Sequence, residues 1–196
     1  MTQADILNKE IEANNGIITT KHIIDIGISK PVFYHFVKET GMEMVSRGIY
    51  ATKEAWLDDA YILSLRCPEI IYSHEEALFM HGLTDREPLE HIVTVKTGYN
   101  PTHISDSCKV YTIKKELYDM GRIIMKDTYG NNIPVYNVER TICDIIRSRN
   151  NIEFQDFQSA LKGYVLRKDK NMILLMEYAE KLRVSKLIRQ YMEVLI

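Results

Sequence analysis

Two histidines and two glutamates stand close together in the segment SHEEALFMHGL, which invites comparison with metal-binding motifs. A zinc-protease helix of the HExxH type places its histidines four residues apart, so that both reach one ion. His74 and His81 are seven residues apart, about two helical turns, so the segment predicts no metal site. Ser73 and Glu76 instead have the S-x-x-E spacing of a capping box, and Gly82 is expected to end that helix.

Nucleophilic and nucleotide chemistry find little support elsewhere in the sequence. Cys143 could be paired with any of six histidines, and Ser-His-Asp sets could be assembled likewise, but no nucleophile elbow or other local signature favours a choice. The stretch 97–101, TGYNP, matches neither GxGxxG nor a P-loop. Cys67, Cys108 and Cys143 are widely spaced and predict buried thiols. We therefore expect no catalytic residue, no metal and no cofactor.

The clearest candidate site is a run of short helices near the N-terminus. A helix with the sequence KHIIDI is expected to start after Thr19 or Thr20 and to end at Gly27. Ser29 then offers its hydroxyl to cap a further helix over residues 30–40. Two helices joined by so short a glycine-containing turn are typical of a helix-turn-helix.

The helix over residues 30–40 has two distinct faces. Its apolar residues recur at helical spacing and predict a buried side formed by Val32, Phe33, Phe36 and Val37. Its polar residues point the other way, where a DNA major groove would be read, and are Lys30, Tyr34, His35 and Lys38. An ordinary solvated helix face is the plainer alternative.

The stretch MVSRGIYAT that follows predicts a β-hairpin. Two β-prone runs, 42–45 and 49–52, flank Ser46-Arg47-Gly48, where glycine permits a turn with positive φ. A hairpin after two such helices indicates a winged helix-turn-helix, whose wing lies along the DNA backbone. Arg47 at its tip would contact phosphate, unless it is a solvated turn residue whose stem covers Tyr50. The expected DNA contacts are Lys21, His22, Ser29, Lys30, Tyr34, His35, Lys38 and Arg47.

Charge is distributed unevenly along the chain. The net charge of -2 excludes a protein that coats nucleic acid by electrostatics alone. Lys and Arg number 5 against 6 acids in residues 1–52, 4 against 10 in 53–106, and 16 against 11 in 109–196. A polyanion is therefore expected to meet the N-terminal part locally and the C-terminal part more broadly. Neither a membrane span nor a signal peptide is recognisable, so we expect a cytoplasmic protein.

The remaining sequence predicts a larger mixed domain. Helices are expected over 53–66 and after Ser73, then strands over 91–96, 109–114, 122–127 and 133–137, then helices over 138–149, 154–166, 172–184 and 186–196. The expected fold class is α+β. Its parts are a winged helix-turn-helix domain over 1–52, a connecting helix within 53–72, and a domain over 73–196 with a small sheet at about 91–137 and helices at about 138–196.

The helix VERTICDIIRSR carries several charges on the side predicted to face solvent. Its apolar residues are expected inside, leaving Arg140, Asp144, Arg147 and Arg149 more exposed. An ion-pair ladder within the helix is the simpler interpretation. The alternative is a surface for a polyanion or a partner, formed by Lys114, Lys115, Arg122, Lys126, Arg140, Arg147, Arg149, Lys162, Arg167 and Lys168.

The order of these features resembles a known family. The hairpin SRGIYAT, then SHEEALFMHGL, VYNVERTICDIIR, ALKGYV and YAEKLRVSKLIRQYMEVL, resembles AbiEi-type antitoxins of bacterial AbiE abortive-infection systems, which are type IV toxin-antitoxin systems. The resemblance covers nearly the whole chain. It implies a winged domain that represses its own operon by binding inverted repeats in promoter DNA, and a C-terminal antitoxic domain. It also implies a nucleotidyltransferase-like toxin that is counteracted without a stable complex, and a role in phage defence.

Two further functions remain open from the residues alone. The acidic, sheet-containing middle could bind a small molecule in a ligand-responsive winged-helix regulator unrelated to a toxin. An enzyme with a DNA-binding head would instead require a pocket with strongly perturbed titrating groups.

Overall fold

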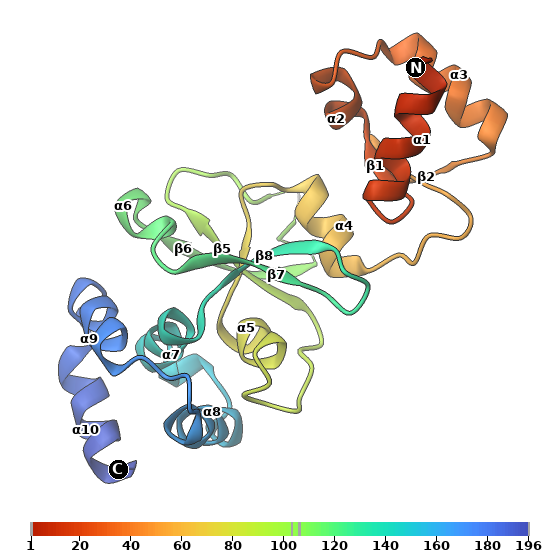
Figure 1. Cartoon of the computed structure of the whole chain (residues 1–196). Helices are drawn as coiled ribbons and strands as arrows, with labels where there is room; N and C mark the ends of the chain where they lie inside the picture. The colour runs from red at the N-terminus through yellow and green to blue at the C-terminus, as the bar shows by residue number, and fades with distance from the viewer. Residues whose placement is uncertain (1, 103, 106, 196) are drawn as a thin grey trace. The chain divides into compact units, whose positions relative to one another are not determined.

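The computed structural model describes residues 2–102, 104–105 and 107–195 (Figure 1). In these residues ten α-helices and eight β-strands form an α+β fold with two small sheets. The chain divides into two compact units. Unit 1 comprises Met1–Pro68 and Met125–Ile133, and unit 2 comprises Glu69–Ile124 and Pro134–Ile196. Unit 1 therefore extends past the expected boundary at residue 52 and takes in a segment of the expected 73–196 domain.

Unit 1 begins with a helix whose first residues satisfy each other's backbone groups. Thr2 caps α1 (Gln3–Ala13): its hydroxyl accepts from the Asp5 N–H, and the Asp5 carboxylate accepts from the Thr2 N–H. The buried side chains of Leu7 and Ile11 pack in one core with Phe33. The other elements of unit 1 are β1 (Ile17–Thr19), α2 (Thr20–Asp25), α3 (Lys30–Thr40), β2 (Glu43–Ser46), β3 (Ile49–Ala51) and α4 (Asp59–Arg66).

A three-stranded antiparallel sheet in the order β1-β3-β2 completes unit 1. The predicted hairpin is confirmed as β2 and β3, and Gly48 in its turn has a φ of 75°, which a residue with a side chain rarely adopts. The register shifts between Met44 and Ser46, so the hairpin carries a bulge. β1 was not predicted, because Ile17 and Ile18 become a strand only by pairing with the distant β3.

Unit 2 is built on a mixed sheet in the order β6-β5-β4-β8-β7. β5 pairs parallel with β6 and antiparallel with β4, and β4 pairs parallel with β8. Its strands are β4 (Ile71–Tyr72), β5 (His91–Lys96), β6 (Cys108–Ile113), β7 (Arg122–Lys126) and β8 (Asn132–Tyr136). The last two residues of β7 and the first two of β8 fall in the segment assigned to unit 1. The four predicted strands are confirmed within one residue at each end. β4 was not predicted, because a strand of two residues is too short to show an alternation of apolar and polar side chains.

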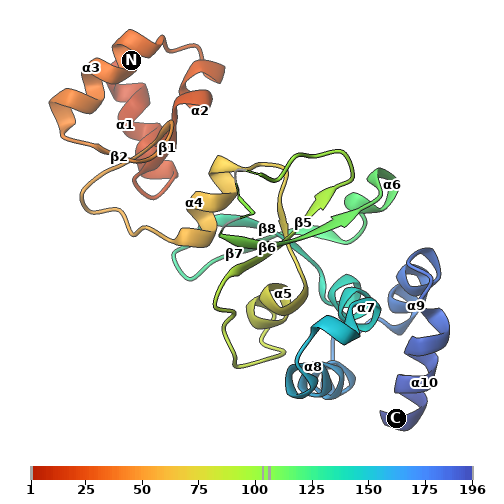
Figure 2. The same cartoon turned by 180° about the vertical axis from the view of Figure 1, so that it is seen from behind.

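Helices cover one side of this sheet. In both views α5 and the group α7 to α10 lie on the same side of the strands (Figures 1 and 2). α7 is the central one, because Ile142, Ile145 and Ile146 are fully buried in the core that it shares with α5, α8 and α9. The helices of unit 2 are α5 (His74–Met80), α6 (Lys115–Tyr118), α7 (Val138–Arg147), α8 (Phe154–Leu166), α9 (Met172–Lys181) and α10 (Ser185–Leu195).

The helix predicted over residues 53–66 is wrong in its first half, since α4 begins only at Asp59. Residues 52–55 are held instead by Gly16: the Thr52 N–H donates to the Gly16 carbonyl at 2.9 Å, and a side chain at Gly16 would meet Thr52 and Ala55. Asp58 then caps α4 by accepting from the Tyr61 N–H at 2.7 Å. Trp56, which the predicted helix would have contained, is 71% exposed.

The predicted capping box at Ser73 and Glu76 is also wrong, although α5 does start at His74. The Ser73 hydroxyl makes no capping bond and is engaged by Thr94 and His74. The Glu76 carboxylate accepts from the Ile92 N–H in β5 at 3.2 Å. Both side chains therefore bind residues of β5 instead of capping the first turn of α5.

The three cysteines and the hydropathy of the helices were also subjects of prediction. Cys67, Cys108 and Cys143 are buried thiols, as predicted. Within the described residues no helix is both long enough and apolar enough to cross a membrane.

Candidate nucleic-acid interface

The candidate interface in unit 1 is built on α2, a tight turn and α3. The Thr19 hydroxyl caps α2 by accepting from the His22 N–H, and α2 ends before Gly27, whose φ is 87°. α3 follows directly, with Ser29 at its N-cap position, and ends at Gly41 in the left-handed conformation. The Ser29 side chain makes no capping hydrogen bond, contrary to our expectation. It is exposed beside the helix start.

The two faces of α3 are as predicted. Phe33 and Phe36 are buried, and Val32 and Val37 pack partly buried against the same core. The residues expected to read DNA, Lys30, Tyr34, His35 and Lys38, are all exposed on the other side. The Tyr34 ring lies 6.2 Å from the Tyr50 ring of β3, so an aromatic contact links the exposed face of α3 to the hairpin.

Two of the expected cationic positions are occupied by histidines that contact carboxylates. His22 Nε2 lies 2.8 Å from a Glu10 oxygen of α1. His35 Nε2 lies 3.2 Å from Glu39, one turn further along α3. A histidine beside a carboxylate adds little net positive charge even when protonated. The cations that remain on this part of unit 1 are therefore Lys21, Lys30, Lys38 and Arg47, all of which are exposed.

The hairpin tip contributes to a hollow that brings cations together from three elements. The pocket has a volume of about 350 Å³ and lies entirely within unit 1. Lys21 of α2, Arg47 of the hairpin turn and Arg66 at the end of α4 all line it. The Thr20 hydroxyl oxygen is buried and has no hydrogen-bond partner among the described residues. Sequence reasoning missed Arg66, because it assigned that residue to the connecting helix; its place beside the β2–β3 hairpin follows from the fold of α4.

The basic surface predicted for the C-terminal part is contradicted at Arg140. Its side chain is 1% exposed, not solvent-facing. Arg140 Nε donates to Asp144 at 2.9 Å, and Nη1 donates to the carbonyls of Leu117 and Met120 at 2.8 Å each. Its guanidinium carbon lies 4.0 Å from the centre of the Tyr136 ring. Arg140 therefore holds α7 to α6 and to the turn that follows it. The ion pair with Asp144 is the part of the prediction that is confirmed.

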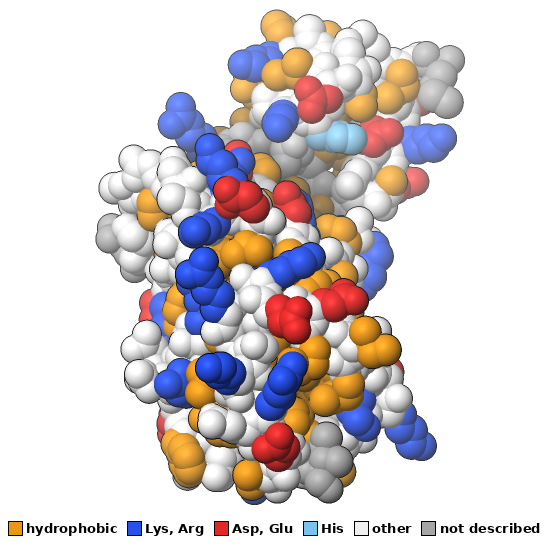
Figure 3. Space-filling model, turned by 90° about the vertical axis from the view of Figure 1, so that its left-hand side faces the viewer, with side chains coloured by type: hydrophobic (Ala, Val, Ile, Leu, Met, Phe, Trp, Pro, Cys, Tyr) orange, Lys and Arg blue, Asp and Glu red, His pale blue; other side chains and the backbone are white. Residues whose placement is uncertain are grey.

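Most of the other predicted cations are exposed but do not form one surface. Arg122 lies 3.6 Å from Asp119, and Arg167 makes two hydrogen bonds to Asp169. Lys126 belongs to unit 1 and donates to the Gly130 carbonyl. On the face shown in Figure 3, Lys and Arg side chains are interspersed with acidic and apolar ones. The remaining predicted residues are exposed: Lys114, Lys115, Arg147, Arg149, Lys162 and Lys168.

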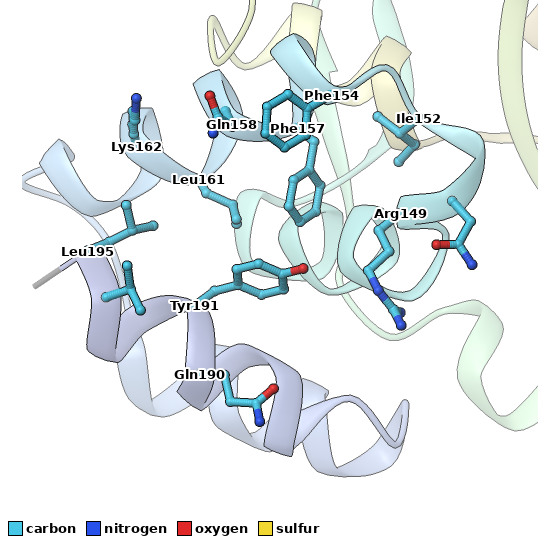
Figure 4. Close-up of a pocket in the computed structure, with 12 residues that line it drawn as sticks. Arg149, Ile152, Phe154, Phe157, Gln158, Leu161, Lys162, Gln190, Tyr191 and Leu195 are labelled. Carbon is cyan, nitrogen blue, oxygen red and sulfur yellow. The ribbon is translucent and has the colours of Figure 1, made fainter.

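Two of these cations flank an apolar pocket between α8 and α10. The pocket has a volume of about 680 Å³, and Phe157 and Leu161 of α8 face Tyr191 of α10 across it (Figure 4). The rings of Phe157 and Tyr191 meet edge to face at 5.2 Å. Arg149 and Lys162 lie among its lining residues. This arrangement suits an apolar group carrying negative charge better than a bare polyanion.

The histidines of the rejected metal motif have structural partners. His81 Nε2 donates to the Tyr136 carbonyl at 2.7 Å, and burial lowers the pKa of this histidine. His74 is buried, and its desolvation lowers its pKa to about 3. The described residues contain no group of three His, Cys, Asp or Glu side chains that could hold a metal ion.

Comparison with known proteins gives the fold and no more. No protein-family model and no curated protein matches the sequence. The crystal structure of the RV2827C protein from Mycobacterium tuberculosis is similar, with a TM-score of 0.53 and 12% sequence identity. The match covers 97% of this chain and 79% of that one. The similarity therefore extends over nearly the whole chain at the level of fold.

Proposed function

We propose that this protein is an AbiEi-type antitoxin that represses its own operon, with unit 1 acting as a winged helix-turn-helix. The observation that carries the proposal is the arrangement of α2, the turn at Gly27 and α3, followed directly by the β2–β3 hairpin with Arg47 at its tip. The exposed polar face of α3 supports it, since that is the face such domains present to the major groove.

The expected mode of binding follows from where the cations lie. α3 would enter the major groove with Lys30, Tyr34 and Lys38 near base edges and flanking phosphates. Lys21, Arg47 and Arg66 line one pocket and would hold the adjacent backbone. The buried Thr20 hydroxyl in that pocket would donate to a phosphate oxygen of this DNA backbone. His22 and His35 contribute less than expected because Glu10 and Glu39 lie against them.

The antitoxic part of the proposal rests on the family resemblance. Unit 2 would counteract a nucleotidyltransferase-like toxin encoded by a neighbouring gene, without a stable complex, and so take part in phage defence. The partner of unit 1 would be double-stranded promoter DNA with inverted repeats, which places the protein in the cytoplasm. The apolar pocket between α8 and α10 is the largest hollow of unit 2 that we describe and is a natural place to test for this activity.

The test uses the full chain and a duplex taken from the promoter upstream of its own gene. Binding is measured by fluorescence anisotropy at moderate salt for the parent protein, for Lys30→Ala/Lys38→Ala, and for Arg47→Ala. We expect each variant to bind at least about tenfold more weakly, because charge-assisted contacts to phosphate are lost. Lys181→Ala, which removes an exposed lysine of α9 in unit 2, is the matched control and should bind within about twofold of the parent.

The two halves of the proposal are separated in cells that carry the neighbouring gene. The unit 1 variants should lose promoter repression and still restore growth. Phe154→Asp, which changes an exposed residue lining the apolar pocket, should do the reverse. Promoter binding by Lys30→Ala/Lys38→Ala as tight as that of the parent would refute the winged-helix assignment. If the unit 1 variants lose growth rescue while the variant in the apolar pocket keeps it, the division of labour between the units is refuted.

A ligand-responsive regulator is the second candidate, because unit 2 contains a polar pocket that includes His74, Tyr111 and Arg147. Binding to a distant promoter that changes with a metabolite, in a genome with no adjacent toxin gene, would favour this candidate.

A further inference from the structure

A second pocket of unit 2 is lined almost entirely by polar side chains. It lies between the start of α5, the strands β5 and β6, and the end of α7, and has a volume of about 250 Å³. This is smaller than the sites that hold drug-sized ligands and suits a group of a few heavy atoms. Four of its lining residues are buried polar or charged ones: His74, Thr94, Arg140 and Asp144. Burying such groups is costly unless each has a partner, so their gathering at one opening requires an explanation.

Part of the explanation is a chain of hydrogen bonds in which each side chain donates to the next, from Thr94 to Ser148. The Thr94 hydroxyl donates to the Ser73 hydroxyl at 2.8 Å, and the Ser73 hydroxyl lies 3.0 Å from His74 Nδ1; we assign the Ser73 proton to this second contact, with Nδ1 as the acceptor. Desolvation and nearby cations keep His74 neutral, with a pKa of about 3. A neutral histidine that accepts at Nδ1 carries its proton on Nε2 and donates to the Ser148 hydroxyl, at 3.2 Å. The Ser148 proton is then left to point into the pocket.

Other donors at the pocket are unused. The Tyr111 hydroxyl oxygen is buried and makes no hydrogen bond of ordinary geometry among the described residues. The nearby Lys109 ammonium, 5.4 Å from the Tyr111 ring centre, could only donate to this oxygen, so the Tyr111 proton stays available. The Tyr111 ring is held in place by stacking on His74, with ring centres 3.6 Å apart. Arg147, at the rim, is exposed and forms no ion pair within the described part of the chain. A buried hydroxyl without a partner is unfavourable in an empty site and favourable once an acceptor arrives.

The charged groups around the pocket favour an acceptor that is negatively charged. The one carboxylate among its lining residues, Asp144, is neutralised by Arg140 at 2.9 Å. Just outside, Lys109 is paired with Glu75 at 2.9 Å. The charged groups that act on His74 are Lys109, Arg140 and Arg147, all cations. At the Tyr111 hydroxyl the carboxylates of Glu75 and Asp144 act in the opposite sense to Lys109, and each of these carboxylates has a cationic partner. Arg147 provides the charge that remains uncompensated.

We propose that this pocket binds the oxyanion group of a small molecule, a phosphate or a carboxylate, with Arg147, the Tyr111 hydroxyl and the Ser148 hydroxyl as its donors. The three groups come from β6 and the end of α7, and their chemistry is that of an anion site. The site is separate from DNA binding by unit 1, so either proposal can fail without the other. Binding here would give unit 2 a means to sense a metabolite.

The test is an NMR titration of the full ¹⁵N-labelled chain with inorganic phosphate and, separately, with acetate, at constant ionic strength kept by chloride. We expect saturable shifts of the Tyr111 and Ser148 amide signals. Arg147→Gln, Tyr111→Phe and Ser148→Ala should each weaken binding at least about tenfold, because each removes a hydrogen bond to a charged group. Each variant is accepted only if its spectrum shows the parent fold.

Arg189→Gln is the matched control, since Arg189 is also an exposed arginine of unit 2 but lines neither this pocket nor the apolar pocket between α8 and α10. It should bind within about twofold of the parent. Saturation by phosphate alone identifies a phosphorylated ligand, and saturation by acetate alone identifies an organic acid. No saturation by either anion, or equal losses in Arg147→Gln and Arg189→Gln, overturns the proposal.

Discussion

At the scale of single residues, the same residue type takes opposite roles in this protein. Arg47 and Arg147 are exposed, whereas Arg140 is enclosed by Asp144, two carbonyls and the Tyr136 ring. Burial raises the pKa of the Asp144 carboxyl, and the Arg140 guanidinium opposes that shift. A buried charge pair of this kind matters mainly because the loss of either partner leaves the other uncompensated.

We therefore predict that Arg140→Ala lowers the free energy of unfolding of unit 2 by roughly 3–5 kcal/mol. Urea denaturation followed by circular dichroism measures the change. Arg149→Ala, an exposed arginine nearby, should change it by less than about 0.5 kcal/mol. Replacing both partners, as in Arg140→Met/Asp144→Leu, should recover part of the loss. Equal effects of the two alanine variants would show that Arg140 is not held as the structure describes.

At the scale of elements, α4 shows how a local pattern can be cut short by the fold around it. Apolar residues in the sequence KEAWLDDAYILSLR recur at helical spacing from residue 53 onward, yet the helix starts at Asp59. The Thr52 N–H donates to the Gly16 carbonyl, the Ala55 N–H closes a turn on the Thr52 carbonyl, and Asp58 provides the cap. α4 then positions Arg66 in the pocket beside Arg47.

The position of that cap can be tested with two neighbouring aspartates. Asp58→Ala should lower the free energy of unfolding by about 1 kcal/mol, because the Tyr61 N–H loses its acceptor. Asp59→Ala, in the first turn, should cost less, since only its favourable interaction with the helix dipole is lost. Thermal denaturation of both variants provides the comparison. Equal effects would indicate that α4 begins before Asp58.

At the scale of the whole molecule, charge limits how the protein can meet DNA. The chain has a net charge of -2, and its first 52 residues carry 5 Lys and Arg against 6 acids. The cations that face outward in unit 1 are few, and two of the expected contacts are histidines beside carboxylates. If unit 1 binds promoter DNA as proposed, specificity must come from α3 and from two copies on a repeat rather than from a large electrostatic attraction.

This predicts a shallow salt dependence. With about three or four phosphate contacts for each copy, the logarithm of the binding constant should fall with the logarithm of salt concentration with a slope of roughly 3–4 per copy. Anisotropy titrations of the full chain on its promoter at several salt concentrations measure the slope. Arg66→Ala should reduce it by about one if this arginine holds a phosphate. A slope near ten per copy would contradict the sparse interface.

The sequence by itself determined the elements whose residues are neighbours along the chain. The helix start at Thr19, the end of α3 at Gly41 and the hairpin around Gly48 all depend on side chains and backbone angles within a few residues. The exposed face of α3 could be predicted for the same reason, because its period of 3.6 residues sorts polar from apolar positions.

Only the tertiary structure decided the features that depend on distant residues. β1 and β4 form because of partners far along the chain, and Glu76 leaves its expected cap to bind the backbone of β5. Arg140 was expected in solvent, yet the carbonyls of Leu117 and Met120 draw it inside. The oxyanion pocket is assembled from α5, β5, β6 and α7. Hydrogen bonds and charges act through space, so a one-dimensional pattern does not record which groups the fold brings together.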